Sequence, residues 1–248
     1  MNCFPLSIKI QGVQKYVIIG NFSDFTAALL EAGFSGAVNG AGGDGVFALF
    51  RYGWGADDES SLFWHSGDPE TDPWEWRMRV LEERKDIAYS KVFFRKAGYI
   101  TRKWYPYFLA ARRGGRTFDD DCSGGKISRS AKRIYEAVAG NGRLPLHEIK
   151  LAAAFRREDN SRFDAALTDL QMKLYVTMCG RQPKISRDGE EYGWASTVFC
   201  TTETFWGRAV FDRAAKIGEE EAVEKISAQI LKLNPAADEK KILRFIKG

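Results

Sequence analysis

The sequence predicts a mixed α+β fold that is predominantly helical and contains a winged helix-turn-helix domain. Three observations support this fold class. Helical spacing of apolar residues dominates the second half of the chain, three such helices are followed by two extended segments, and a small unit of mixed character precedes them. With 248 residues and 44% hydrophobic side chains, the chain is long enough to bury a substantial core.

Residues 1–66 predict a small mixed α/β unit. The runs "LSIKI" and "KYVIIG" are apolar and extended, so they are expected to pair as a hairpin. Phe25 and Leu29 place an apolar stripe on a helix, which Ser23 would cap and Gly33 would end.

Residues 67–126 predict a helical region rich in basic and aromatic side chains. The pair Asp72-Pro73 combines a good N-cap with a proline at the first helical position. Apolar residues at helical spacing from 76 to 87 extend that helix, and a second helical run is expected to begin near Thr101.

The stretch 91–116, "KVFFRKAGYITRKWYPYFLAARRGGR", holds eight lysines and arginines, seven aromatic residues and no acid. Unpaired positive charge binds phosphates and aromatic faces stack on bases, so the composition suits a nucleic-acid platform. Alternatively, the rings form the core of a helical layer and only the basic side chains reach solvent. We favour the second interpretation for the rings. The acidic segment 52–76 precedes this stretch, and whether it masks the basic charges stays open.

Residues 127–202 follow the order of a winged-helix domain. Ser128 caps the first helix, the third carries apolar residues at helical spacing, and two extended runs enclose a polar turn at Asp188-Gly189. The third helix and its lead-in carry four basic and four acidic residues, so they offer no net attraction to phosphates. Residues 203–248 predict amphipathic C-terminal helices.

The candidate nucleic-acid contacts are therefore the basic residues of the stretch 91–116 and of the predicted wing. They are Arg95, Lys96, Arg102, Lys103, Arg112, Arg113, Arg181, Lys184 and Arg187.

The runs "GDPETDPWEWR", "GRLPLHEIK" and "ALTDLQMKLYVTMCGRQ" resemble the AlkZ-related bacterial proteins. That group is distantly similar to winged-helix DNA glycosylases that remove alkylated bases, so the resemblance implies a scaffold linked to DNA repair. The glycosylase signature, Gln-aliphatic-Gln or Gln-aliphatic-Asp, has no match here. Gln171-Met172-Lys173 ends in lysine, and Gln11 and Gln14 have the wrong spacing. No catalytic residue can therefore be transferred from the glycosylases.

Two other functions stay open. Asp68 and Glu70 lie near tryptophans, and a carboxylate beside an aromatic pocket could activate water in a divergent DNA glycosylase acting on alkylated bases. Asp68 also suits a turn before Pro69. The third possibility is a protein-interaction or ligand-sensing module in which the winged helix is purely structural.

Composition excludes several classes of site. Four dispersed cysteines and two histidines indicate neither a metal site nor a disulfide framework, and no glycine-rich cofactor motif lies between a strand and a helix. No apolar run approaches the length of a membrane span. We therefore expect a cytoplasmic protein without cofactor or metal, with DNA as its partner; the oligomeric state stays open.

Overall fold

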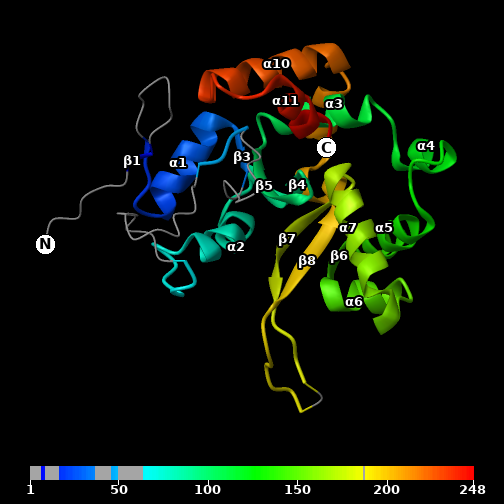
Figure 1. Cartoon of the computed structure of the whole chain (residues 1–248). Coiled ribbons are helices and arrows are strands. Elements are labelled where there is room, and N and C mark those ends of the chain that lie inside the picture. The colour runs from blue at the N-terminus through cyan, green and yellow to red at the C-terminus, as the bar shows by residue number, and fades with distance from the viewer. Residues whose placement is uncertain (1–6, 9–16, 37–45, 50–63, 187) are drawn as a thin grey trace, which may run out of the picture.

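The computed structural model describes residues 7–8, 17–36, 46–49, 64–186 and 188–248, which form a mixed α+β structure dominated by helices. Figure 1 shows the arrangement. In chain order the elements are β1 (Ser7–Ile8), β2 (Val17–Ile18), α1 (Phe22–Ala32), β3 (Phe34–Gly36), α2 (Pro73–Glu83), β4 (Ile87–Phe93), β5 (Lys96–Thr101), α3 (Tyr105–Arg113), α4 (Phe118–Ser123), α5 (Arg129–Asn141), β6 (Arg143–Pro145), α6 (Leu146–Ala152), the 3-10 helix η1 (Arg157–Asp159), α7 (Asn160–Met172), β7 (Val176–Gln182), β8 (Ser196–Thr201), α8 (Thr202–Trp206), α9 (Arg208–Ala214), α10 (Glu219–Leu233) and α11 (Glu239–Lys247).

The first three-stranded sheet, in the order β3-β5-β4, lies between two layers of helices (Figure 1). Strand alternation explains this, since successive side chains point to opposite faces. Ala88 and Ile100 pair across the strands and face the core formed with α3, α10 and α11. The next pair, Tyr89 and Tyr99, faces the core formed with α1 and α2. Both faces of this sheet are therefore buried.

The prediction of a helical region over 67–126 is wrong for its middle part. Helix α2 ends at Glu83, and residues 87–101 form the antiparallel hairpin β4–β5 instead. Its strands are apolar on both faces because helices cover both, so the period of two that marks a half-buried strand is missing from the sequence. The aromatic rings do belong to the core, as Phe93, Trp104 and Phe108 are all buried.

The core between this sheet and the helices α3, α10 and α11 joins distant parts of the chain. Phe34 of β3 contacts Phe108 of α3 and Phe245 of α11, with ring centroids 5.3 and 5.8 Å apart. Residues from the predicted segments 1–66, 67–126 and 203–248 thus share one hydrophobic cluster. The C-terminal helices, confirmed as helices, complete a core that the N-terminal part begins.

The second three-stranded sheet, in the order β6-β8-β7, packs against α5, α6 and α7 (Figure 1). Ile134 and Val138 of α5 and Leu170 of α7 are fully buried in its core. Beyond the last residue pair, Gln182 with Ser196, residues 183–186 and 188–195 form a projecting hairpin that we call the arm.

Side chains of α7 and β7 connect the second sheet and its helices to the elements around the first sheet. Gln171 of α7 is buried, and its side-chain oxygen accepts hydrogen bonds from Ser90 Oγ at 2.8 Å and from the Lys91 amide at 3.0 Å. This satisfies an amide on the outer edge of β4. Arg181 of β7 forms ion pairs with Glu75 at 2.8 Å and Glu82 at 3.1 Å, both on α2.

Helix ends follow the sequence signals closely, with one exception. Asp72 caps α2 ahead of Pro73, and Ser128 caps α5, as predicted. The predicted cap at Ser23 is wrong, because Asn21 accepts the bond from the Asp24 amide. Gly33 ends α1 at φ 92°, and a side chain there would collide with the Trp104 ring.

Candidate nucleic-acid interface

The tip of the β4–β5 hairpin has an unusual backbone. Phe93 pairs with Lys96, so Phe94 and Arg95 form a two-residue turn, and both have positive φ, at 50° and 61°. Such turns normally use asparagine and glycine, because other side chains are strained there. Phe94 is held in place by Phe245, whose ring centroid lies 6.0 Å away. The turn therefore presents Arg95 in a fixed position.

Arg112 of α3 binds the C-terminal ends of two helices, α7 and α11, which lie beside that turn. Its guanidinium donates hydrogen bonds to the carbonyl of Met172 at 2.7 Å, of Ile246 at 2.7 Å and of Phe245 at 2.8 Å. These carbonyls belong to the last turns of α7 and α11, where backbone acceptors lack helical partners. Burial lowers the pKa of Arg112 to about 9, so it remains charged at neutral pH.

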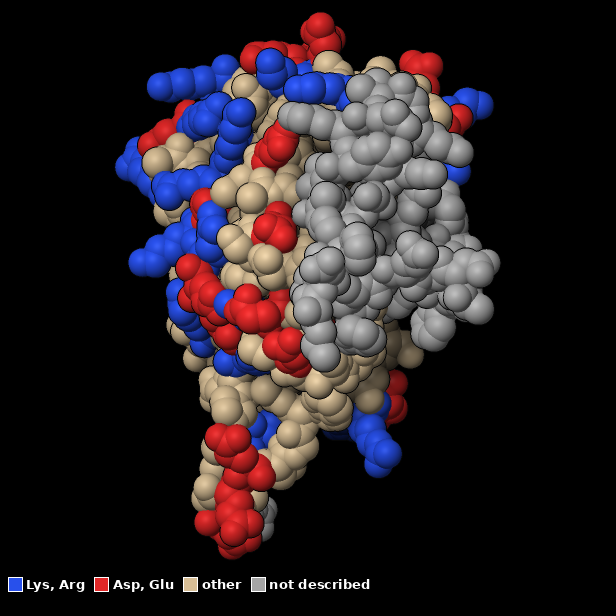
Figure 2. Space-filling view, turned by 90° about the vertical axis from the view of Figure 1, so that its left-hand side faces the viewer, with Lys and Arg blue, Asp and Glu red and all other residues tan. Residues whose placement is uncertain are grey.

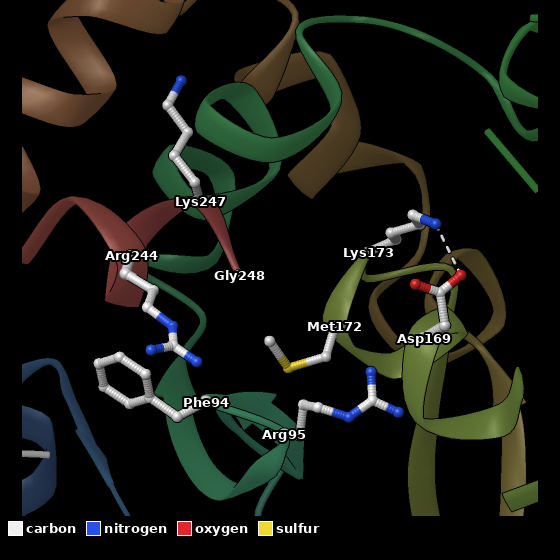
Figure 3. Close-up of a pocket in the computed structure, with 8 residues that line it drawn as sticks. All are labelled: Phe94, Arg95, Asp169, Met172, Lys173, Arg244, Lys247 and Gly248. Carbon is white, nitrogen blue, oxygen red and sulfur yellow. Dashed lines mark hydrogen bonds and ion pairs between the residues drawn. The ribbon is translucent and has the colours of Figure 1, made fainter. Parts of the chain in front are cut away.

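The hairpin tip and the two helix ends enclose a cavity of about 260 Å³, which we call the basic cavity (Figure 3). Phe94 and Arg244 lie on one side of it, Asp169 and Lys173 on the other, with Met172 between them and Arg95 reaching under Met172. Its lining residues are Phe94, Arg95, Asp169, Met172, Lys173, Arg244, Lys247 and Gly248.

The four cations around the basic cavity differ in their partners. Lys173 pairs with Asp169 at 2.6 Å, and Lys247 pairs with Glu219 of α10 and extends away from the other side chains. Arg95 and Arg244 are exposed, and neither forms an ion pair with a carboxylate in the described part of the chain. Arg244 instead lies 5.4 Å above the Phe94 ring. These two arginines are the charges open to an anion.

The other exposed cations of the predicted stretch lie elsewhere. Lys96 is exposed beside Arg95, at the hairpin tip. Arg102 and Lys103 are also exposed, but they follow the opposite end of β5. Seven residues of extended chain separate Arg95 from Arg102, which corresponds to roughly 20 Å. The predicted basic face therefore divides into two separate places.

Arg112 and Arg113 do not form part of an exposed basic face, contrary to the prediction. Arg113 is buried, pairs with Glu203 at 3.1 Å and lies 4.3 Å above the Tyr175 ring. As described above, Arg112 is engaged by three carbonyls. Both guanidiniums bind other parts of the fold: Arg112 binds the ends of α7 and α11, and Arg113 binds Glu203 of α8. Neither is available to a ligand.

Asp121 organises the segment that follows α3. It is buried and accepts hydrogen bonds from Tyr175 Oη at 2.8 Å and Arg116 Nε at 2.6 Å. Burial alone would raise the pKa of Asp121, but the bonds from Tyr175 and Arg116 lower it below its ordinary value. Arg116, the last cation of the predicted basic stretch, is thus also used structurally.

The three basic residues predicted as wing contacts differ in their surroundings. Arg181 is tied to the two glutamates of α2, Lys184 is half-buried, and Arg187 lies outside the described residues. Acidic side chains cover the end of the arm in Figure 2, where Asp188, Glu190 and Glu191 are exposed. The described residues at the end of the arm therefore offer phosphates no attraction.

The two carboxylates considered for catalysis serve the local structure. Asp68 accepts hydrogen bonds from Thr71 Oγ1 at 2.5 Å and the Glu70 amide at 3.0 Å, and these bonds lower its pKa. Glu70 pairs with Arg79 at 2.9 Å. Activating water requires a general base whose pKa lies near the working pH, and the lowered pKa of Asp68 makes it a weak base for that role.

The glutamine of the incomplete glycosylase signature is likewise committed. Besides the two bonds that the Gln171 oxygen accepts, its amide nitrogen donates to the Leu167 carbonyl at 3.0 Å. Gln11 and Gln14 lie outside the described residues.

Sequence reasoning missed the contribution of α11. Lys240, Arg244 and Lys247 recur at i, i+4 and i+7, which places them on one helical face, while Ile242 and Phe245 are buried on the other. That spacing was the available signal. It does not reveal that this face lies beside a hairpin tip some 150 positions earlier in the chain.

Two other kinds of site were sought in the described ranges. They contain no group of three or more His, Cys, Asp or Glu side chains arranged to hold a metal ion. Among their helices, none has both the length and the apolar character to cross a membrane.

Comparison with known proteins identifies the family. A search of the curated proteins finds no match, and neither does a search of the solved structures. A family model described as AlkZ related matches residues 19–247, which is nearly the whole chain. The chain therefore belongs to the AlkZ-related family.

Proposed function

We propose that this protein is a winged-helix nucleic-acid-binding protein that serves DNA repair and contacts phosphates at the basic cavity. Membership of the AlkZ-related family supports the link to DNA repair. The element order α5, β6, α6, α7, β7, β8 supports the winged-helix assignment for residues 127–202, with β7 and β8 as the strands of the wing.

The third helix of this unit, α7, does not carry the contact by itself. Arg162 pairs with Asp159 at 3.1 Å and Lys173 with Asp169 at 2.6 Å, so its cations are already neutralised within the helix and its lead-in. Nucleic-acid affinity comes mainly from cations that neutralise phosphates. The contact is therefore placed at the C-terminal end of α7, where other segments supply charge.

The observation that carries the proposal is the convergence of Arg95 and Arg244 on one cavity. Arg95 comes from the β4–β5 hairpin and Arg244 from α11, and neither has a carboxylate partner among the described residues. Both lie beside Lys173 and the half-buried ring of Phe94. A planar guanidinium binds phosphate oxygens with two parallel hydrogen bonds. Two such groups facing one cavity suit a sugar-phosphate backbone.

The test is the salt dependence of binding to labelled duplex and single-stranded DNA, followed by fluorescence anisotropy. The double variant Arg95→Ala/Arg244→Ala removes two phosphate contacts. For duplex DNA the slope of log K against log salt concentration should therefore become less steep by about 1.8. Affinity at low salt should fall for all sequences alike, because phosphate contacts do not read bases.

The double variant Arg102→Ala/Lys103→Ala is the matched control. It also removes two exposed cations, but at the opposite end of β5. Its slope should equal that of the wild type. Absence of DNA binding by the wild type at low salt would refute the proposed function, whereas equal losses in the two variants would refute only the placement of the contact.

A further inference from the structure

The arm, residues 183–186 and 188–195, keeps a defined hairpin shape although it projects from the body (Figure 1). The Tyr192 amide donates to the Lys184 carbonyl at 3.0 Å, and the Ser186 amide donates to the Glu190 carbonyl at 2.8 Å. Ile185 and Glu191 form an additional antiparallel bridge. The arm therefore presents its side chains in fixed places rather than as a loose loop.

Large apolar side chains gather on this arm. Trp194 is 83% exposed, and Ile185 and Tyr192 are each 55% exposed. Three of the seven exposed large hydrophobic residues in the described ranges thus lie on the twelve described residues of the arm. Apolar groups grouped on an exposed, ordered element mark an interaction site, since covering them removes apolar area from water.

The charges of the arm decide between kinds of partner. Asp188, Glu190 and Glu191 are exposed, and none of them forms an ion pair in the described part of the chain. Positions 183–195 also contain Lys184 and Arg187, which leaves this segment with a formal charge of −1. The three acids outnumber the two bases, so a nucleic acid is the less favoured partner. A cationic protein surface with an apolar recess is the complementary partner.

The chain itself carries such a surface. The basic cavity presents two unpaired guanidiniums, Arg95 and Arg244, next to the apolar side chains of Phe94 and Met172. An indole ring binds well against a guanidinium, which stacks on its face. Within one molecule the arm projects away from the body, on the far side from the C-terminal end that lines the cavity (Figure 1), so the two cannot meet in the same chain.

We propose that the arm of one copy docks in the basic cavity of a second copy, with Trp194 entering the cavity and the acidic end of the arm facing Arg95 and Arg244. The contact is heterologous, because a different surface of each copy takes part. Each pair leaves one arm and one cavity open, so association continues into rings or chains. Nucleic acid competes for the same cavity and would disperse these assemblies.

Mass measurement by light scattering after size exclusion, at low salt and rising protein concentration, tests the contact. The wild type should grow beyond the monomer mass and return to it at about 0.5 M salt, where charge attraction is screened. The variants Trp194→Ala and Arg95→Glu/Arg244→Glu should each stay monomeric. Their equimolar mixture should form a dimer and nothing larger, because one supplies the only intact cavity and the other the only intact arm.

The control is Leu151→Ala on α6, which removes an equally exposed apolar side chain, 75% exposed, outside both surfaces and should associate like the wild type. Circular dichroism verifies that each variant is folded. A wild type that stays monomeric at all concentrations overturns the proposal. So does a mixture that remains monomeric, or a Trp194→Ala variant that loses DNA affinity but associates normally, since the arm would then serve nucleic acid.

Discussion

Replacing Arg112 with alanine should destabilise the whole fold rather than weaken a surface contact. The substitution leaves the carbonyls of Met172, Phe245 and Ile246 without their donor. A buried acceptor that loses its partner costs about 1–3 kcal/mol. The neighbouring cavity admits water, which replaces part of the lost bonding, so the lower value applies to each carbonyl. The expected loss in the free energy of unfolding is therefore about 3 kcal/mol.

Urea unfolding at pH 7, followed by circular dichroism, measures this loss for Arg112→Ala, Arg112→Lys and Arg102→Ala. Lysine keeps the charge but lacks the planar fork that reaches three acceptors, so it should recover only part of the stability. Arg102 is exposed, and its substitution should change stability by less than about 0.5 kcal/mol. A loss below about 1 kcal/mol for Arg112→Ala would refute the role assigned to this guanidinium.

Three further predictions concern other polar side chains that hold the fold together. Gln171→Leu should lower the free energy of unfolding by about 1–3 kcal/mol in urea, because the Lys91 amide loses its acceptor. An unchanged free energy of unfolding would instead point to a functional role for the glutamine. Because folding lowers the pKa of Asp121, its ionised carboxylate stabilises the folded state above the unfolded pKa, and this stabilisation is lost as the pH falls through the folded pKa. In thermal melts, Asp121→Asn should therefore be destabilising at pH 7 and nearly neutral at pH 2. Arg181→Ala should cost less than about 1 kcal/mol, with a smaller effect at high salt and no change in DNA affinity; a loss of affinity would return it to the interface.

Local signals predicted much of the fold because they act within one turn of chain. Asp72 with Pro73 and Ser128 are caps whose partners lie two or three residues away, so their positions follow from the sequence itself. The hairpin β4–β5 was missed for the opposite reason. Its strands face helices on both sides, and its turn is Phe94-Arg95 rather than a sequence containing glycine or asparagine.

The candidate site was only half predictable. Arg95 and Arg112 look alike in sequence, since both are arginines among aromatic residues. Their difference arises from partners that are distant along the chain. The acceptors of Arg112 lie 60 to 134 positions away, while no such acceptor is found for Arg95 among the residues that the structure describes. The positions where α7 and α11 end decide which cations have partners within the protein and which remain accessible to an anion. No local sequence pattern encodes those positions.

The core shared by the two ends of the chain has a consequence for synthesis. Gln229 bonds to the carbonyl of Ala32 across 197 positions, and Asn234 bonds to that of Val46 across 188. At translation speeds of about 5–20 residues per second, roughly 10–40 s separate the two partners. The core around the second sheet draws on residues 118–199, so it can form on the ribosome in that interval. The apolar face of β3 stays partly uncovered until α10 and α11 have been made. Slow stretches of translation and chaperone binding should therefore matter most for this N-terminal part of the nascent chain.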